Sequence, residues 1–198
     1  MVVDAAVSGV FAPELLVTVV TIVLAGYELL TTDAGWRGVT CRVATVLVAF
    51  VLAFGIYQGG PETVSASVPG GEDFFASLGL IAGFVVIWFA WHRWEWGDLL
   101  PVYCLLLIGT SAVHLVVVPF WDVSSHVVYA AVSTGFLTFV DRRFVASLLV
   151  PLGLTWSRVA LEAHTVVESV GGLVFASVIV AAAFFAGTIP KNGVAGSP

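Results

Sequence analysis

The chain has 198 residues, of which 60% are hydrophobic and only 10% are charged. Soluble domains are about 45–50% apolar and about 25% charged, so this composition excludes an ordinary water-soluble fold and favours a membrane protein. The net charge of −6, with a single lysine at Lys191, argues against a surface that binds nucleic acid.

Long apolar runs recur along the whole chain and predict seven transmembrane helices. A bilayer core needs about 20 apolar residues in a helix, and it does not tolerate irregular backbone exposed to lipid. The predicted helices cover residues 15–31, 39–57, 74–91, 99–120, 126–140, 144–156 and 163–187. The sixth is short, about 20 Å at 1.5 Å per residue, so we expect it to continue past Arg158 or to lie where the membrane is thin. The pattern predicts an all-α, polytopic transmembrane helix bundle.

No polar linker is long enough to separate two folds, so residues 1–198 are predicted to form one membrane domain. Residues 1–97 hold the first three helices, residues 98–187 a C-terminal core, and residues 188–198 a flexible tail. The first apolar run lacks a basic segment before it and a cleavage site, which favours a retained helix over a signal peptide.

Basic residues predict the orientation, because short loops rich in Lys and Arg stay in the cytoplasm. All but one fall on one side of the predicted topology: Arg37, Arg42, Arg93, Arg142, Arg143 and Lys191. We therefore expect a multi-pass protein of the cell membrane with its N-terminus outside and its C-terminus in the cytoplasm. The exception, Arg158, lies on the outer side, either as a functional residue or as an arginine that extends to the interface.

Two stretches on the outer side, residues 123–126 and 157–168, contain most of the reactive side chains. His164 and Glu168 are four residues apart, which places them on one helix face and lets the carboxylate hold one imidazole nitrogen while the other attacks. Arg158 offers a fork of donors for phosphate oxygens, and His126 is placed to donate a proton. Ionisable groups near a membrane are costly and usually functional.

These stretches resemble the signatures of the PAP2 (type 2 phosphatidic acid phosphatase) superfamily. Ser157 and Arg158, followed after five residues by His164 and after three more by Glu168, are similar to its third signature, S-R-x5-H-x3-D, with Glu in place of Asp. Val-Ser-Ser-His at residues 123–126 resembles the second signature, P-S-G-H. The resemblance covers about residues 114–187 and implies a PAP2-like core in the C-terminal half of the chain.

The resemblance also implies a mechanism that needs no metal and no cofactor. His164 would be the nucleophile that forms a phosphohistidine, Glu168 would orient it, and His126 would be the general acid. The residues that it implies in substrate binding are Arg158, Ser124, Ser125, Ser157 and His114. The implied partners are a lipid or polyprenyl phosphate substrate and the membrane lipids around it.

The first signature of the family, K-x6-R-P, has no counterpart in this chain. His114 stands where the Lys would fall and Trp121 where the Arg would fall. The loss of two cations weakens the stabilisation of a phosphate dianion by several kcal/mol if nothing replaces them. Two readings follow. One is a membrane phosphatase that hydrolyses a lipid or polyprenyl phosphomonoester or diphosphate at the extracytoplasmic face, and the other is an inactive PAP2-like protein that binds a phosphorylated lipid or a partner protein.

Two further classes stay open. A small transporter would use Glu28 or His114 as its proton site, although Glu28 also suits a position at the membrane interface. A membrane metallohydrolase would use His126, His164 and Glu168 as ligands.

The tryptophans at positions 88, 91, 94 and 96 predict an aromatic belt at the cytoplasmic interface.

Overall fold

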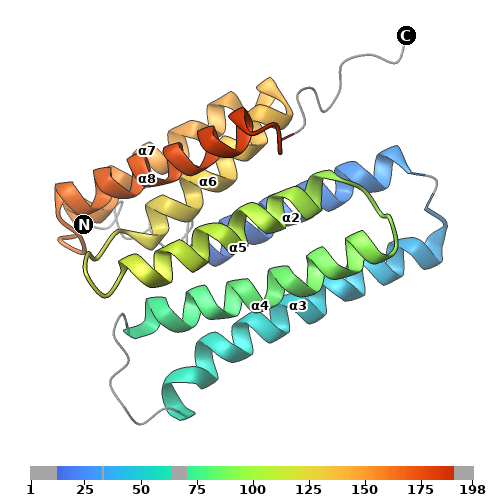
Figure 1. Ribbon diagram of the computed structural model, residues 1–198, viewed down its shortest axis with the longest axis horizontal. Helices are drawn as coiled ribbons and strands as arrows, with labels where there is room; N and C mark the ends of the chain where they lie inside the picture. The colour runs from blue at the N-terminus through green and yellow to red at the C-terminus, as the bar shows by residue number, and fades with distance from the viewer. Residues whose placement is uncertain (1–12, 33, 64–70, 190–198) are drawn as a thin grey trace. The chain divides into compact units, whose positions relative to one another are not determined.

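The computed structural model describes residues 13–32, 34–63 and 71–189, and this part of the chain is helical with no strand (Figure 1). The all-α prediction is confirmed. The α-helices are α2 (Pro13–Thr31), α3 (Trp36–Thr63), α4 (Gly71–Arg93), α5 (Leu99–Val117), α6 (Ser125–Val140), α7 (Leu149–Ala160) and α8 (Val166–Phe185), and the 3₁₀ helix η1 (Arg142–Leu148) directly precedes α7. Most of the predicted flexible tail lies outside the described residues.

Five helices, α2, α3, α4, α5 and α8, are long and apolar enough to cross a membrane. Helix α6 has 16 residues and α7 has 12, so at 1.5 Å per residue they measure about 24 and 18 Å, less than a bilayer core of about 30 Å. Helix α7 continues two residues past Arg158, as expected. The helices indicate a membrane protein, while the crossing of α6 and α7 and the orientation stay predictions.

The chain divides into two compact units. Unit 1 contains residues 1–20 and 122–198, and unit 2 contains residues 21–121, so that α2 contributes to both. The division falls inside the predicted core of residues 98–187. Helix α5 belongs to unit 2, whereas α6, α7 and α8 belong to unit 1.

In unit 2, α3 and α4 run antiparallel and approach closely at two glycines. A Cβ atom added to Gly79 would lie 2.5 Å from the carbonyl oxygen of Ala53, and one added to Gly83 would lie 2.9 Å from that of Ala49. Glycines four residues apart form the small-residue motif that lets membrane helices pack backbone to backbone. The sequence analysis did not identify this motif.

The glycine contact gives a stability prediction. Gly79→Ala is expected to lower the free energy of unfolding by about 1–3 kcal/mol, because the new methyl group has backbone on its far side and no room to move. Gly55→Ala in the neighbouring helix is the matched control, since its Cβ would meet nothing within 4 Å. Denaturant titration in detergent measures both, and equal stability of the two variants would contradict this packing.

Glu28 in unit 2 is only 3% exposed, and its carboxylate accepts three hydrogen bonds. Oε2 accepts from Trp91 Nε1 at 2.8 Å, and Oε1 accepts from the backbone N–H groups of Leu99 at 2.6 Å and Leu100 at 3.2 Å. The first N–H groups of a helix lack partners within it, so Glu28 caps α5 from another helix. Its burial and its three hydrogen bonds give Glu28 a structural role that the sequence analysis did not predict, while its place at the membrane interface stays a prediction.

The tryptophan cluster is likewise more than an interfacial belt. Trp91 is fully buried and packs edge to face on Trp96, with ring centroids 4.9 Å apart. The guanidinium carbon of the buried Arg42 lies 5.6 Å from the centroid of the Trp96 ring. The Arg42 guanidinium donates to the backbone carbonyl of Trp96 at 3.1 Å and to Thr32 Oγ1 at 3.0 Å. Trp91 therefore packs inside unit 2, whereas Trp94 is exposed, and the belt at the cytoplasmic interface stays a prediction.

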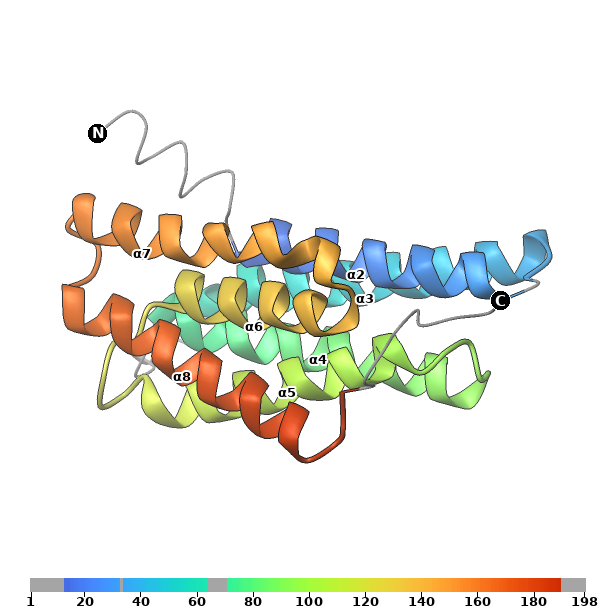
Figure 2. The same cartoon turned by 90° about the horizontal axis from the view of Figure 1, so that it is seen from above.

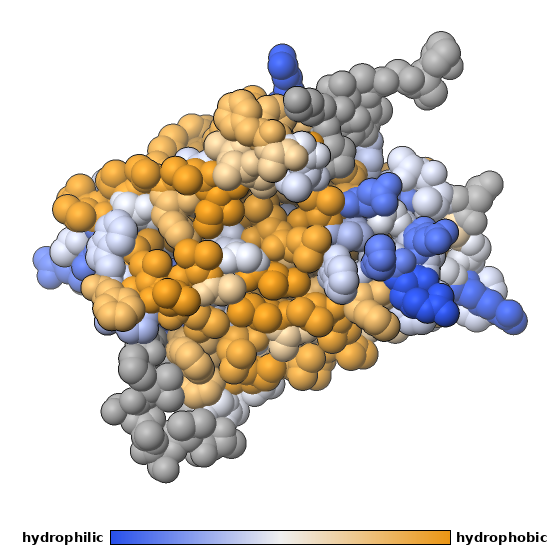
Figure 3. Space-filling view, viewed as in Figure 1, coloured by the Kyte–Doolittle hydropathy of each residue, from blue (hydrophilic) through white to orange (hydrophobic). Residues whose placement is uncertain are grey.

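The outer surface of unit 2 is apolar. Val51, Phe54 and Leu47 of α3 are all more than half exposed. Hydrophobic side chains dominate the visible surface over the helices of this unit (Figure 3). Such an exposed apolar face suits contact with lipid rather than water.

In unit 1, α6 and α8 run in the same direction and α7 runs the opposite way (Figures 1 and 2). A Cβ atom on Gly172 would lie 3.3 Å from the carbonyl oxygen of Ser124 near the start of both helices, and Phe139 stacks on Phe184 near their ends at 4.3 Å. Val127 and Ala130 of α6 form a buried cluster with Leu154 of α7, and Leu173 of α8 packs against this cluster. The N-terminal ends of α6 and α8 therefore lie at the same end of unit 1 as the C-terminal end of α7.

Candidate functional site

The turn between α7 and α8 fixes the position of His164. The N–H of Ala163 donates to the carbonyl of Arg158 at 3.1 Å, and the N–H of Glu162 donates to that of Val159 at 3.0 Å. Glu162 has a φ of 57°, so these bonds form a Schellman motif with a glutamate at the left-handed position usually held by glycine. The N–H of His164 also donates to the Arg158 carbonyl, at 3.3 Å.

Helix α8 then begins with a capping box. Thr165 Oγ1 accepts from the N–H of Glu168 at 3.2 Å, and Glu168 Oε2 accepts from the N–H of Thr165 at 2.7 Å. Because the helix starts at Val166, His164 precedes it, and the prediction that His164 and Glu168 share a helix face is wrong. The box nevertheless brings Glu168 Oε2 to 3.7 Å from His164 Nδ1.

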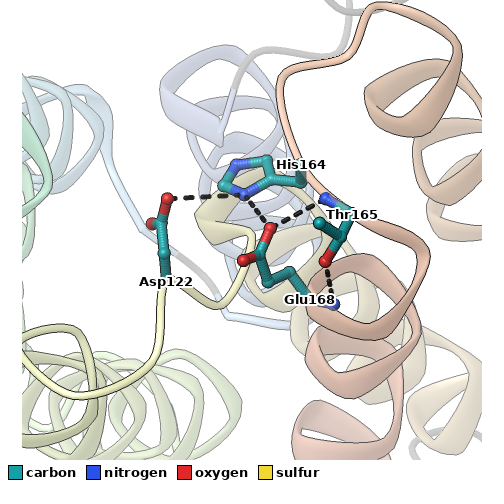
Figure 4. A network of polar contacts seen from close by, with 4 residues as sticks. All are labelled: Asp122, His164, Thr165 and Glu168. Atoms are coloured by element: carbon teal, nitrogen blue, oxygen red, sulfur yellow. Dashed lines mark hydrogen bonds and ion pairs between the residues drawn. The ribbon is translucent and has the colours of Figure 1, made fainter.

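A second carboxylate approaches the same nitrogen of His164. Asp122 Oδ2 lies 3.9 Å from His164 Nδ1, so the Nδ1 edge faces both acidic side chains (Figure 4). The His164 side chain is 7% exposed, whereas that of Asp122 is 63% exposed. Both separations exceed hydrogen-bond distance, and the contacts are ion pairs only when the imidazole is protonated. Nε2, on the opposite edge of the ring, is the nitrogen that remains for chemistry.

The sequence analysis gave Asp122 no role. Its only signal was an acidic residue directly before the stretch at residues 123–126. The contact with His164 joins two segments more than forty residues apart, which no local pattern predicts.

The N-terminus of α6 lies beside this turn. Ser124 is the N-cap residue, and its side chain makes no capping hydrogen bond. Ser125 and His126 are the first residues of the helix, where backbone N–H groups have no partner in the helix and the helix dipole is positive. Ser124 is fully buried. The arrangement is therefore suited to receive an anion.

The structure brings seven of the eight predicted site residues to one end of unit 1. His126, Ser124 and Ser125 lie at the start of α6, Ser157 and Arg158 in the last turn of α7, and His164 and Glu168 at the start of α8. Ser157 is fully buried, and Arg158 is partly exposed.

His114, the eighth residue, lies in unit 2. It is 1% exposed, and its Nδ1 lies 3.1 Å from the hydroxyl of Ser77, which joins α4 to α5. The predicted contact between His114 and substrate phosphate stays a prediction.

The described residues include no group of three or more His, Cys, Asp or Glu side chains that is arranged to hold a metal ion. The ligand set of the metallohydrolase alternative, His126, His164 and Glu168, therefore does not form such a group in this part of the chain. The reactive side chains are instead one arginine, two histidines and two carboxylates, a set suited to acid–base and nucleophilic chemistry.

Comparison of the chain with models of protein families finds no match. Comparisons with curated proteins and with solved structures find none either.

Proposed function

We propose that this protein is a PAP2-like membrane phosphatase that removes phosphate from a lipid or polyprenyl phosphomonoester or diphosphate at the extracytoplasmic face. The observation that carries the proposal is the environment of His164. Two carboxylates face its Nδ1 edge, and the turn that holds it lies beside the N-terminus of α6, where an anion is favoured. A histidine held in this way presents Nε2 as a nucleophile.

The reaction takes two displacements at phosphorus. Nε2 of His164 attacks the phosphorus atom, the bond to the leaving oxygen breaks, and His126 gives that oxygen a proton. A water molecule, deprotonated by His126, then attacks the phosphohistidine, which releases phosphate and restores His164. Glu168 and Asp122 stabilise the positive charge that the ring gains in the first step.

The phosphate oxygens would be held by Arg158, by the Ser124 hydroxyl and by the positive end of the helix dipole at the start of α6. Charge-assisted hydrogen bonds from a guanidinium suit the spread of negative charge over a phosphoryl group in transit. The apolar helices suit a substrate whose tail remains in the bilayer while its headgroup reaches the site.

An inactive PAP2-like binding protein is the second candidate. Residues 114–122 contain no Lys or Arg, so the two cations of the first signature are missing. His114, which stands at the position of the lysine, is engaged with Ser77 and nearly fully buried. These observations favour binding without turnover, and phosphate release by the purified protein separates the two candidates.

The assay measures phosphate release by the purified full-length protein in detergent. The substrates are phosphatidic acid, phosphatidylglycerol phosphate and a polyprenyl diphosphate, each with and without a chelator. The wild type is expected to release phosphate from at least one substrate, and chelator should not reduce the rate. Release from none of them by folded protein would favour the binding protein, and loss of release with chelator would favour a metallohydrolase.

Arg158→Lys is expected to lower kcat/KM by about 10²-fold in this assay. Lysine keeps the charge but loses the planar fork that holds two phosphate oxygens at once. Arg143→Lys is the matched control, because the Arg143 side chain is 91% exposed and pairs only loosely with Asp141. Equal kcat/KM values for Arg158→Lys and Arg143→Lys would show that Arg158 does not bind the phosphate.

A further inference from the structure

Helix α8 carries a buried hydroxyl group that the proposed mechanism does not use. Ser169 is fully buried, and its Oγ atom makes no hydrogen bond within the described part of the chain. Serines inside helices normally donate to a carbonyl one turn earlier, as Ser177 Oγ of the same helix does to Leu173 at 2.7 Å. A buried hydroxyl without a partner is unfavourable, and such a group in a native protein calls for a ligand or a water molecule.

The position of Ser169 follows from its helix. It lies three residues before Gly172, hence on the same face and one turn nearer the N-terminus of α8. A Cβ atom on Gly172 would be 3.3 Å from both the Ser124 carbonyl oxygen and a methyl group of Val123. His164, just before α8, contacts Asp122, and Gly172, farther along α8, packs against Val123 and Ser124. Ser169 lies between these two contacts, so this part of α8 runs beside residues 122–124, which lead into α6.

A second buried hydroxyl without a hydrogen-bond partner lies just before α6. Ser124 is fully buried, and its Oγ atom also makes no hydrogen bond within the described residues. Serine is one of the best N-cap residues, yet the Ser124 side chain makes no capping hydrogen bond to its helix. Two buried hydroxyls without a hydrogen-bond partner therefore lie on the two segments that pack together where Gly172 meets Ser124.

We infer that Ser169 is a ligand-binding residue that, together with Ser124 and the N-terminus of α6, holds a phosphoryl oxyanion. Both hydroxyls would donate to phosphate oxygens, and these neutral donors would partly replace the two cations that the first signature lacks. Ser169 touches no reacting bond, so its contribution is to binding. The inference rests on the proposed function for the identity of the substrate, but not for the binding of the anion itself.

The experiment compares the full-length wild type with Ser169→Ala and with Ser177→Ala. Ser177 is the matched control, because it lies on the same helix, is exposed and bonds only its own helix. One arm titrates inorganic phosphate and follows its phosphorus NMR line width. The other measures binding to phosphatidylcholine nanodiscs with and without phosphatidic acid. Ser169→Ala is expected to weaken binding by about tenfold, the effect of losing one hydrogen bond to a charged group, and Ser177→Ala to leave it unchanged.

Thermal unfolding of the same variants separates a binding role from a structural one. Removal of a hydroxyl that lacks a partner should leave the melting temperature of Ser169→Ala unchanged or raised, even as phosphate binding weakens. Weaker binding in either arm supports the inference, and the arm in which it appears shows whether free phosphate or the lipid headgroup is recognised.

Equal binding by Ser169→Ala and wild type in both arms, no binding by the wild type, or a clearly lowered melting temperature of Ser169→Ala would overturn the inference. These failures differ from failure of the proposed function. Anion binding that depends on Ser169 without any phosphate release would contradict the phosphatase proposal but support the Ser169 binding site. Phosphate release together with unaltered binding by Ser169→Ala would contradict the Ser169 site but support the phosphatase proposal.

Discussion

His164→Ala is expected to reduce phosphate release by at least about 10³-fold while the protein remains folded. The side chain would supply the attacking nitrogen, and removal of a covalent nucleophile leaves only the rate that binding and electrostatics provide. His164 precedes α8 and takes part in neither hydrogen bond of its capping box, so the helix start should survive the change. Phosphate release and thermal unfolding of the same preparation measure the two effects.

The matched control for this change is His92→Ala. His92 is exposed and stacks on Trp88 in unit 2, so its loss should leave phosphate release unchanged. Equal release by wild type and His164→Ala would rule out the phosphohistidine route. A loss of release in both variants would instead point to a general effect on folding.

Glu168→Gln separates the two roles of Glu168. Glutamine keeps an oxygen that can accept from the Thr165 N–H, and the capping box accepts either residue, so the free energy of unfolding should be nearly unchanged. The negative charge beside His164 is lost, and with it part of the support for a positively charged ring. Phosphate release should therefore fall, by less than in His164→Ala because Asp122 keeps its charge.

Glu28→Ala is expected to have the largest effect on stability, a loss of at least about 3 kcal/mol. The substitution leaves the indole N–H of Trp91 and the backbone N–H groups of Leu99 and Leu100 buried without an acceptor, each at a cost of about 1–3 kcal/mol. Gly97 packs directly against the Glu28 side chain, so the turn before α5 loses support as well.

Denaturant titration of Glu28→Ala and Glu14→Ala in the same detergent measures this effect. Glu14 lies on the same helix but is exposed, so its loss should cost less than about 1 kcal/mol. Equal stability of the two variants would contradict the capping role of Glu28. Proton-coupled flux in proteoliposomes that Glu28→Ala alone abolishes, with stability unchanged, would favour the transporter alternative.

The helices could be predicted from sequence because each apolar run in a membrane has to become a helix. The starts and ends were less certain, since they depend on local hydrogen bonds. The apolar pattern of residues 163–187 did not show that α8 begins at Val166, because Ala163 is as apolar as the helix itself. The signal was present in Thr165 and Glu168, whose spacing is that of a capping box.

The contacts of buried polar groups could not be predicted from spacing. Glu28 caps a helix about seventy residues away, and Asp122 meets His164 across a gap of more than forty residues. Such pairs depend on which helix faces pack together. The hydrophobic pattern does not identify those faces in a membrane protein, because nearly every face of each helix is apolar. The Gly79 and Gly83 pair was readable from the sequence and was overlooked.

The central claim, that His164 becomes phosphorylated, is tested most directly by trapping the intermediate. Full-length protein in detergent is mixed with ³²P-labelled substrate, quenched within milliseconds to seconds, and examined for protein-bound phosphate. The account predicts a label that is lost in acid, is stable in base, maps to His164 and is absent from His164→Ala. Phosphate release without any such label, or an equal label on His164→Ala, would contradict it.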